Sequence, residues 1–156
     1  MDKTNVMRAL ERAKISYTPH EYDASDGKID GVSVANKVGL PPASVFKTLV
    51  TRAHGGAVLV FVIPVERELD LKKAARAAAV KSVEMLRQSE LLPTTGYVHG
   101  GCSPVGMKKR FPTFVDASAG SLPSMTVSAG KIGAQAELAP GDLLRITGGL
   151  LADLCV

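Results

Sequence analysis

Two neighbouring β-rich runs decide the fold: Val45-Phe46-Lys47-Thr48-Leu49-Val50 and Ala57-Val58-Leu59-Val60-Phe61-Val62-Ile63. His54-Gly55-Gly56 stands between them, and glycine allows the backbone conformations that a tight turn needs. The pair therefore predicts a β-hairpin. Both faces of the first run are mainly apolar, as expected of a central strand, so this hairpin is predicted to lie inside a sheet.

Shorter patterns on either side of the hairpin predict interleaved helices and strands. Before it, we expect a helix over 5–14 capped by Asp2 or Thr4, an extended segment over 17–22 and a helix over 32–38. After it, we expect helices over 71–79 (N-cap Asp70) and 82–90, strands over 96–99, 113–116, 124–127 and 135–138, and a helix start at 140–144. These elements do not repeat as βαβ units, so the pattern favours an α+β fold with a mixed sheet.

Length and composition narrow the class of protein. The chain has 156 residues without a repeat or linker, so 1–156 is expected to form a single domain. Hydrophobic residues make up 46% of the chain and aromatic residues 4%, which predicts an aliphatic core. We see no signal peptide and no run long enough to cross a membrane. Two widely separated cysteines, without CxxC spacing, indicate neither a zinc site nor a disulfide framework, which is typical of a cytoplasmic protein.

Lys47 is the unusual residue of the first run. Alternation places Val45, Lys47 and Leu49 on one face of the strand. An ammonium on an apolar strand must either reach water or point into a pocket, because burying it without a partner is costly. Taken alone, the pattern favours the first reading, in which the side-chain stem packs and the ammonium reaches solvent.

Two glycine-rich segments are candidate binding loops. Gly100-Gly101-Cys102-Ser103-Pro104-Val105-Gly106 allows unusual backbone angles, and successive N–H groups in such a loop can hold a phosphate or an oxyanion. Ser128-Ala129-Gly130-Lys131-Ile132-Gly133 has the same character. For both segments an ordinary tight turn is the alternative. The basic run Lys108-Lys109-Arg110 after the first loop, within a net charge of +4, is by itself typical of a solvated turn.

Other polar residues give weaker signals. His99 and Cys102 lie three positions apart and suggest a thiol nucleophile, but no third orienting group is evident. His20 stands near two carboxylates without metal-ligand spacing, so no metal site is expected. No pair of carboxylates stands out for acid–base catalysis. The residues therefore indicate positioning groups rather than a protein nucleophile.

Four blocks, in this order, resemble the YbaK/EbsC family over nearly the whole chain: Phe46-Lys47-Thr48-Leu49, Leu71-Lys72-Lys73-Ala74-Ala75, Gly100 to Lys109 and Val127 to Gly133. These proteins are Cys-tRNA(Pro) deacylases related to the editing domain inserted in bacterial prolyl-tRNA synthetases. The resemblance implies a YbaK-like editing domain whose mixed sheet curls into a partial barrel flanked by helices. The chain departs from the family pattern at Cys102 and Met107, which replace an aliphatic residue and Gln.

The resemblance also implies the site. Lys47 would be essential, and the substrate would be bound by Tyr22, Thr48, Gly100, Gly101, Ser103, Pro104, Gly106, Ser128 and Gly130. Lys108, Lys109 and Arg110 would contact tRNA, prolyl-tRNA synthetase would be a partner, and neither cofactor nor metal would be needed. The implied chemistry is cyclisation of the cysteinyl thiol onto its own ester. Three alternatives stay open: an Ala-tRNA(Pro) deacylase that uses a water, a non-catalytic RNA-binding module, and a hydrolase that uses Cys102 and His99.

Overall fold

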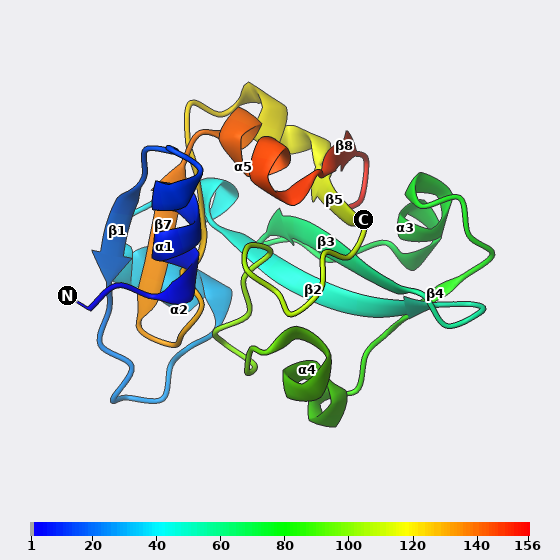
Figure 1. Cartoon of the computed structure of the whole chain (residues 1–156), viewed down its shortest axis with the longest axis horizontal. Coiled ribbons are helices and arrows are strands. Elements are labelled where there is room, and N and C mark those ends of the chain that lie inside the picture. Colours follow the sequence, from blue (N-terminus) through cyan, green and yellow to red (C-terminus); the bar gives the residue numbers. More distant parts are fainter. Residues whose placement is uncertain (1) are drawn as a thin grey trace.

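The computed structural model describes residues 2–156. Its elements, shown in Figure 1, are helices and strands interleaved along the chain: α1 Asn5–Arg12, β1 Thr18–Glu21, α2 Gly31–Val38, η1 Pro42–Ser44, β2 Phe46–Ala53, β3 Val58–Pro64, α3 Leu71–Ala77, β4 Val83–Met85, α4 Gln88–Thr95, β5 Thr113–Asp116, η2 Ala117–Ser121, β6 Met125–Ser128, β7 Ala134–Leu138, α5 Pro140–Thr147 and β8 Leu150–Ala152.

The strands form two sheets, of which the smaller is antiparallel and the larger is mixed. One has the order β1-β7-β6, and the other has the order β4-β2-β3-β5-β8. β3, β5 and β8 run parallel to one another, whereas the remaining neighbours are antiparallel. A parallel bridge between Val45 and Thr126 links the sheets beside β2 and β6. The predicted α+β class with mixed pairing is confirmed, but the strands divide into two sheets and do not close into a barrel.

The hairpin that decides the fold is observed at the centre of the larger sheet. β2 and β3 pair from Phe46↔Pro64 to Arg52↔Val58, and the long hairpin runs across the middle of the molecule (Figure 1). Gly55 and Gly56 turn the chain between the strands with φ of 97° and 103°. Left-handed angles of this kind favour glycine, so the turn prediction is confirmed with its physical reason.

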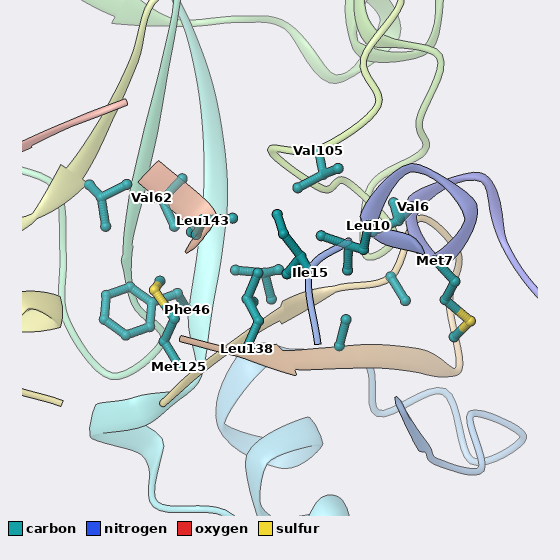
Figure 2. Close-up of a cluster of buried hydrophobic side chains, with 14 of the residues drawn as sticks. Val6, Met7, Leu10, Ile15, Phe46, Val62, Val105, Met125, Leu138 and Leu143 are labelled. Atoms are coloured by element: carbon teal, nitrogen blue, oxygen red, sulfur yellow. The ribbon is translucent and has the colours of Figure 1, made fainter. Parts of the chain in front are cut away.

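Apolar side chains from both sheets meet in an aliphatic core. Figure 2 shows the larger cluster, in which Val6, Met7 and Leu10 of α1 pack toward residues of both sheets such as Phe46 and Leu138. On the other side of the hairpin, Phe61 and Phe114 stack with ring centroids 5.5 Å apart, beneath α3. The expected caps are present: Thr4 Oγ1 accepts from the Met7 N–H, and Asp70 accepts from Lys72 and Lys73.

Two predicted elements are wrong, and short elements such as β4 and β8 were missed. Residues 82–90 are not one helix, because Val83–Met85 pairs with Thr51–Ala53 as β4 and α4 begins only at Gln88. Residues 96–99 form no strand, since Gly96 ends α4 with a φ of 87° and the chain turns there. β8 was not predicted. It has only three residues, and it forms a strand through its pairing with β5. No helix within residues 2–156 is long and apolar enough to span a membrane.

Candidate functional site

A cavity of about 300 Å³ lies against β2. Its walls come from segments far apart in the sequence: the α2 start, β2, the turn after β3, α4, the glycine-rich loop at 100 and the β6–β7 hairpin. The residues that line it are Ile29, Asp30, Gly31, Val34, Val45, Phe46, Lys47, Thr48, Leu49, Val65, Leu91, His99, Gly100, Cys102, Ser128 and Gln135. The structure therefore brings Lys47, Thr48, Gly100 and Ser128 of the expected site together.

The cavity lies beside an open edge of β2. The Val45 C=O accepts a hydrogen bond from the Val65 N–H (2.8 Å). Because bonded and non-bonded positions alternate along an antiparallel pair, the N–H and C=O groups of Phe46, Thr48 and Val50 point away from β3. β4 pairs only with Thr51–Ala53, and Leu86 takes the Val50 C=O (3.0 Å). The backbone N–H and C=O of Thr48 therefore face the open edge.

Thr48 also presents a hydroxyl that the folded chain does not satisfy. Its Oγ1 is buried, and it has no hydrogen-bond partner among the residues that the structure describes. Buried polar atoms without a partner are uncommon, because losing water without replacing its hydrogen bonds costs about 1–3 kcal/mol. Backbone and side chain of Thr48 together supply donors and acceptors that a bound ligand can use.

Lys47 faces the same cavity and is half-buried. The ion pairs formed within residues 2–156 leave its ammonium without a carboxylate partner. A lysine with an unneutralised charge at a cavity wall attracts an anion. The sequence left two possibilities for this residue, an ammonium that reaches water or one that points into a pocket. Both hold, since the Lys47 ammonium reaches solvent through a pocket that a ligand can occupy.

The two glycine-rich loops form one wall of the cavity together. A Cβ atom at Gly100, where φ is 89°, would lie 2.8 Å from Ile29 Cδ1, and one at Gly101 would lie 3.1 Å from the Lys131 backbone. Gly100 therefore lets the first loop approach the segment before α2, and Gly101 lets it pack closely against the second loop. Ser128 Oγ accepts from the Gly130 N–H (3.1 Å), which leaves its own O–H free to donate to a ligand.

Tyr97 fastens the first loop to α1. Its hydroxyl donates to the Val105 C=O and accepts from Asn5 Nδ2 (2.8 Å). Gly106 and Gly130 pack against the same pair, since a Cβ at either position would lie within 2.9 Å of a Tyr97 or Asn5 atom. Sequence reasoning missed this clasp, because a tyrosine in a short loop gives no sign of its distant partners.

Several residues of the expected site do not line the cavity. Gly101 and Ser103 are buried and bonded inside the loop, the N–H of Gly101 to Val98 O and the Ser103 Oγ to the Val105 N–H. Tyr22 is 9% exposed, and its hydroxyl has no partner within residues 2–156. Other members of the expected site (Pro104, Gly106, Lys109, Arg110) line a separate hollow of about 220 Å³. Their contact with substrate or tRNA stays a prediction, as does that of Tyr22, Gly101, Ser103 and Gly130.

The basic triplet spreads apart at the ends of two helices. Lys108 Nζ donates to Pro93 O in the last turn of α4 (3.3 Å). Arg110 donates to Ile146 O and Thr147 O at the end of α5 (both 3.2 Å). Cations stabilise the carbonyl end of a helix, so both residues have a structural role here. The prediction that Lys108, Lys109 and Arg110 contact tRNA remains untested.

His99 and Cys102 both line the cavity. Burial raises the pKa of the Cys102 thiol to about 12. A thiol is nucleophilic as its thiolate, so Cys102 stays protonated and inert near neutral pH. Within residues 2–156, no group of three or more His, Cys, Asp or Glu side chains gathers into a possible metal site. The arrangement offers a cation, hydroxyls and backbone groups around an apolar hollow.

Sequence reasoning missed two polar residues of the wall. Asp30 lies at the start of α2, and Gln135 lies in β7 with 6% of its surface exposed. Gln135 stands between Ala134 and Ala136 in a buried strand, where an amide side chain is out of place. This polar residue between two buried alanines was the sign in the sequence that could have identified Gln135 as a site residue. Asp30 shows only the pattern of a helix cap.

Comparison with known proteins finds a family model and relatives that match this chain. Residues 30–146 match the model of the aminoacyl-tRNA editing domain family. Over 152 residues, the chain is 46% identical to EbsC of Enterococcus faecalis, which carries the name of a Cys-tRNA(Pro)/Cys-tRNA(Cys) deacylase; the match covers 97% of this chain and 93% of EbsC. Bacillus subtilis YwhH is 25% identical over 123 residues, which are 79% of this chain and 76% of YwhH.

Solved structures show the same fold. A crystal structure described as that of a trans-editing enzyme for prolyl tRNA synthetase has a TM-score of 0.83 and 26% identity, covering 99% of both chains. The crystal structure of the hypothetical protein APE2540 has a TM-score of 0.89 and 23% identity, and the match covers 98% of this chain and 100% of the other. At this identity the match supports only the fold. The resemblance to the YbaK/EbsC family is thereby confirmed. Because the family model matches residues 30–146 and EbsC is 46% identical over 97% of this chain, the chain belongs to the family of aminoacyl-tRNA editing domains.

Proposed function

We propose that the protein removes cysteine from mischarged Cys-tRNA(Pro), acting in trans on the aminoacyl ester, and that Cys-tRNA(Cys) is a second substrate. One observation supports this most directly: Lys47, the open edge at Thr48 and Ser128 face one cavity, and Cys102, the one thiol that residues 2–156 contribute to its wall, is held protonated. The site thus offers positioning groups without an activated nucleophile. The name carried by EbsC, a relative with 46% identity, points to the same substrates.

The proposed chemistry uses the thiol of the substrate. The cysteinyl sulfur attacks its own ester carbonyl, so a C–S bond forms and the ester C–O bond breaks. The thiol proton passes to the released ribose hydroxyl, and the amino acid leaves as a thiolactone. Such a reaction needs orientation of the ester, which contributes several kcal/mol in favourable cases, and donors for the oxyanion.

Each cavity group has a role in this scheme. Lys47 binds the terminal phosphate or ribose and holds the ester in place. The Thr48 N–H and the Ser128 hydroxyl are donors on the same wall, available to the carbonyl oxygen as negative charge develops on it. Because Lys47 positions the substrate, its loss should affect turnover without affecting folding.

Substitution of Lys47 tests the proposal. Lys47→Ala should lower deacylation of Cys-tRNA(Pro) by at least about 100-fold, since both binding and orientation depend on the ammonium. Lys81→Ala is the matched control, because Lys81 is exposed and lies outside the cavity. Near-normal turnover by Lys47→Ala would contradict the assigned role.

A panel of substrates separates the chemical alternatives. Cys-, Ala-, Ser- and Pro-tRNA should be compared, with cysteine strongly preferred if the substrate thiol is the nucleophile. Rapid hydrolysis of Ala- or Ser-tRNA would indicate an activated water and would favour the Ala-tRNA(Pro) deacylase. No turnover of any of them would favour a non-catalytic RNA-binding module.

We also propose that prolyl-tRNA synthetase supplies selection of the tRNA. Lys108 and Arg110 already donate to helix carbonyls, and the net charge is only +4. Few phosphate contacts give weak, salt-dependent binding. Gel shifts with and without the synthetase should show tight tRNA(Pro) binding only in its presence. Tight and selective binding by this chain alone would contradict the partnership.

A further inference from the structure

Two full charges of opposite sign lie on the wall of the cavity. Among residues 2–156, Asp30 is the one carboxylate and Lys47 the one ammonium that line it. The end of a charged tRNA also carries two charges, a phosphate and the α-ammonium of the esterified amino acid. Lys47 accounts for the phosphate or ribose. An ammonium enclosed in a cavity without an anion is costly, so the substrate needs a second partner there.

Asp30 is fixed at the wall by the start of α2. It is the N-cap residue, and its Oδ2 accepts from the Ser33 N–H (3.1 Å). Gly31 lets the helix approach the sheet, because a Cβ at that position would lie 2.4 Å from Val65 Cγ1. Val65 lines the cavity too, so this close approach brings the start of α2 against the cavity wall.

The carboxylate is charged and accessible. Hydrogen bonding to the side chain and backbone of Ser33 lowers the pKa of Asp30, so it is ionised at neutral pH. The Ser33 N–H donates to Oδ2, and the Asp30 side chain is exposed at the mouth of the cavity. A carboxylate has more acceptor sites than the cap uses, so Asp30 can hold the helix start and accept from a ligand as well.

Thr48 and Gln135 add polar groups to the same wall. Gln135 is 6% exposed as a residue and lines the cavity with its neighbours from β2. The Thr48 hydroxyl is buried and lacks a partner within residues 2–156. Native proteins rarely leave a buried polar atom unpaired, so a polar ligand is expected beside Thr48.

We propose that Asp30 binds the free α-ammonium of the aminoacyl ester, so that the enzyme acts on unblocked aminoacyl-tRNA and spares N-acylated forms. This inference rests on the proposed function, since it specifies which chemical feature of that substrate the cavity recognises. Acylation turns the ammonium into a neutral amide and removes the attraction to Asp30. Peptidyl-tRNA, whose α-nitrogen is an amide, then escapes deacylation for the same reason.

The test compares Cys-tRNA with N-acetyl-Cys-tRNA, both of which retain the thiol. Wild-type protein should favour the free-amino substrate by about tenfold in kcat/KM. Asp30→Asn keeps a capping side chain and removes the charge, and it should reduce this preference below about threefold. Asp70→Asn makes the same change at the N-cap of α3, outside the cavity, and should keep the wild-type preference. An unchanged preference in Asp30→Asn, or none in the wild type, would overturn the inference.

A binding measurement separates failure of this inference from failure of the proposed function. If the wild type cleaves neither substrate, the proposed function is contradicted but the role of Asp30 can still be measured. The probe is 3′-cysteinylamino-3′-deoxyadenosine 5′-phosphate, an amide that cannot be cleaved by ester chemistry. N-acetylation of this probe should weaken its binding to the wild type about tenfold and to Asp30→Asn less than about threefold. Equal weakening in both proteins would overturn the assignment, and Asp30→Ser is the second variant if Asp30→Asn folds poorly.

Discussion

Removing the hydroxyl of Tyr97 should loosen the loop that forms one wall of the cavity. Tyr97 is 5% exposed, and burial raises the pKa of its phenol, so the hydroxyl stays protonated and donates. The hydroxyl donates a hydrogen bond to the Val105 C=O and accepts one from Asn5 Nδ2 (2.8 Å). Tyr97→Phe keeps the ring and removes both hydrogen bonds at once.

The expected cost follows from what is left unpaired. The Val105 C=O is buried and loses its donor, while Asn5 keeps only a long contact of 3.5 Å to Gly106 O. A buried group left without its partner costs about 1–3 kcal/mol, so we expect a loss of about 2 kcal/mol. In a chain of this length that corresponds to a fall in Tm of about 4–8 °C.

Urea unfolding followed by circular dichroism measures this loss directly. The m value should stay unchanged, since the surface exposed on unfolding is the same. Tyr17→Phe is the matched control, because its hydroxyl donates to Glu11 Oε2 (2.7 Å) at the surface, where water replaces the bond. If Tyr97→Phe lowers the free energy of unfolding by less than about 0.5 kcal/mol, or if both variants lower it equally, the Tyr97 hydroxyl does not hold the loop to α1.

Two further predictions concern a buried acid and the cavity thiol. Burial raises the pKa of Asp116, but hydrogen bonds from Ser118 and the Leu154 N–H outweigh it and the net pKa is lowered. The ionised carboxylate therefore stabilises the fold above its unfolded pKa of about 4, and this contribution is lost as pH falls through the folded value. The stability gap between wild type and Asp116→Asn, measured in urea, should narrow from pH 7 to pH 2; a constant gap would contradict this. Cys102→Ser should lower kcat less than about tenfold, whereas a loss above about 1000-fold would identify a thiol nucleophile.

The elements with strong local patterns could be predicted from the sequence. Alternating apolar runs and a glycine turn specify the β2–β3 hairpin, and Asp70 before an alanine-rich stretch specifies the start of α3. β4 and β8 could not be predicted, since each has three residues and is held as a strand by pairing with a neighbour. Short segments carry too little periodicity for their pairing to be read from the sequence.

By itself, the sequence determined the hairpin, the aliphatic core and the family that its motif blocks resemble. It also supplied Lys47: the strand pattern taken alone favoured a lysine that reaches water, and the family resemblance assigned this lysine to the site. Only the tertiary structure shows the pocket that Lys47 lines, where β4 stops short of Thr48 and leaves one edge of β2 open. Asp30 and Gln135 became visible for the same reason: they lie 105 positions apart (135 − 30) and share a wall only after the chain has folded.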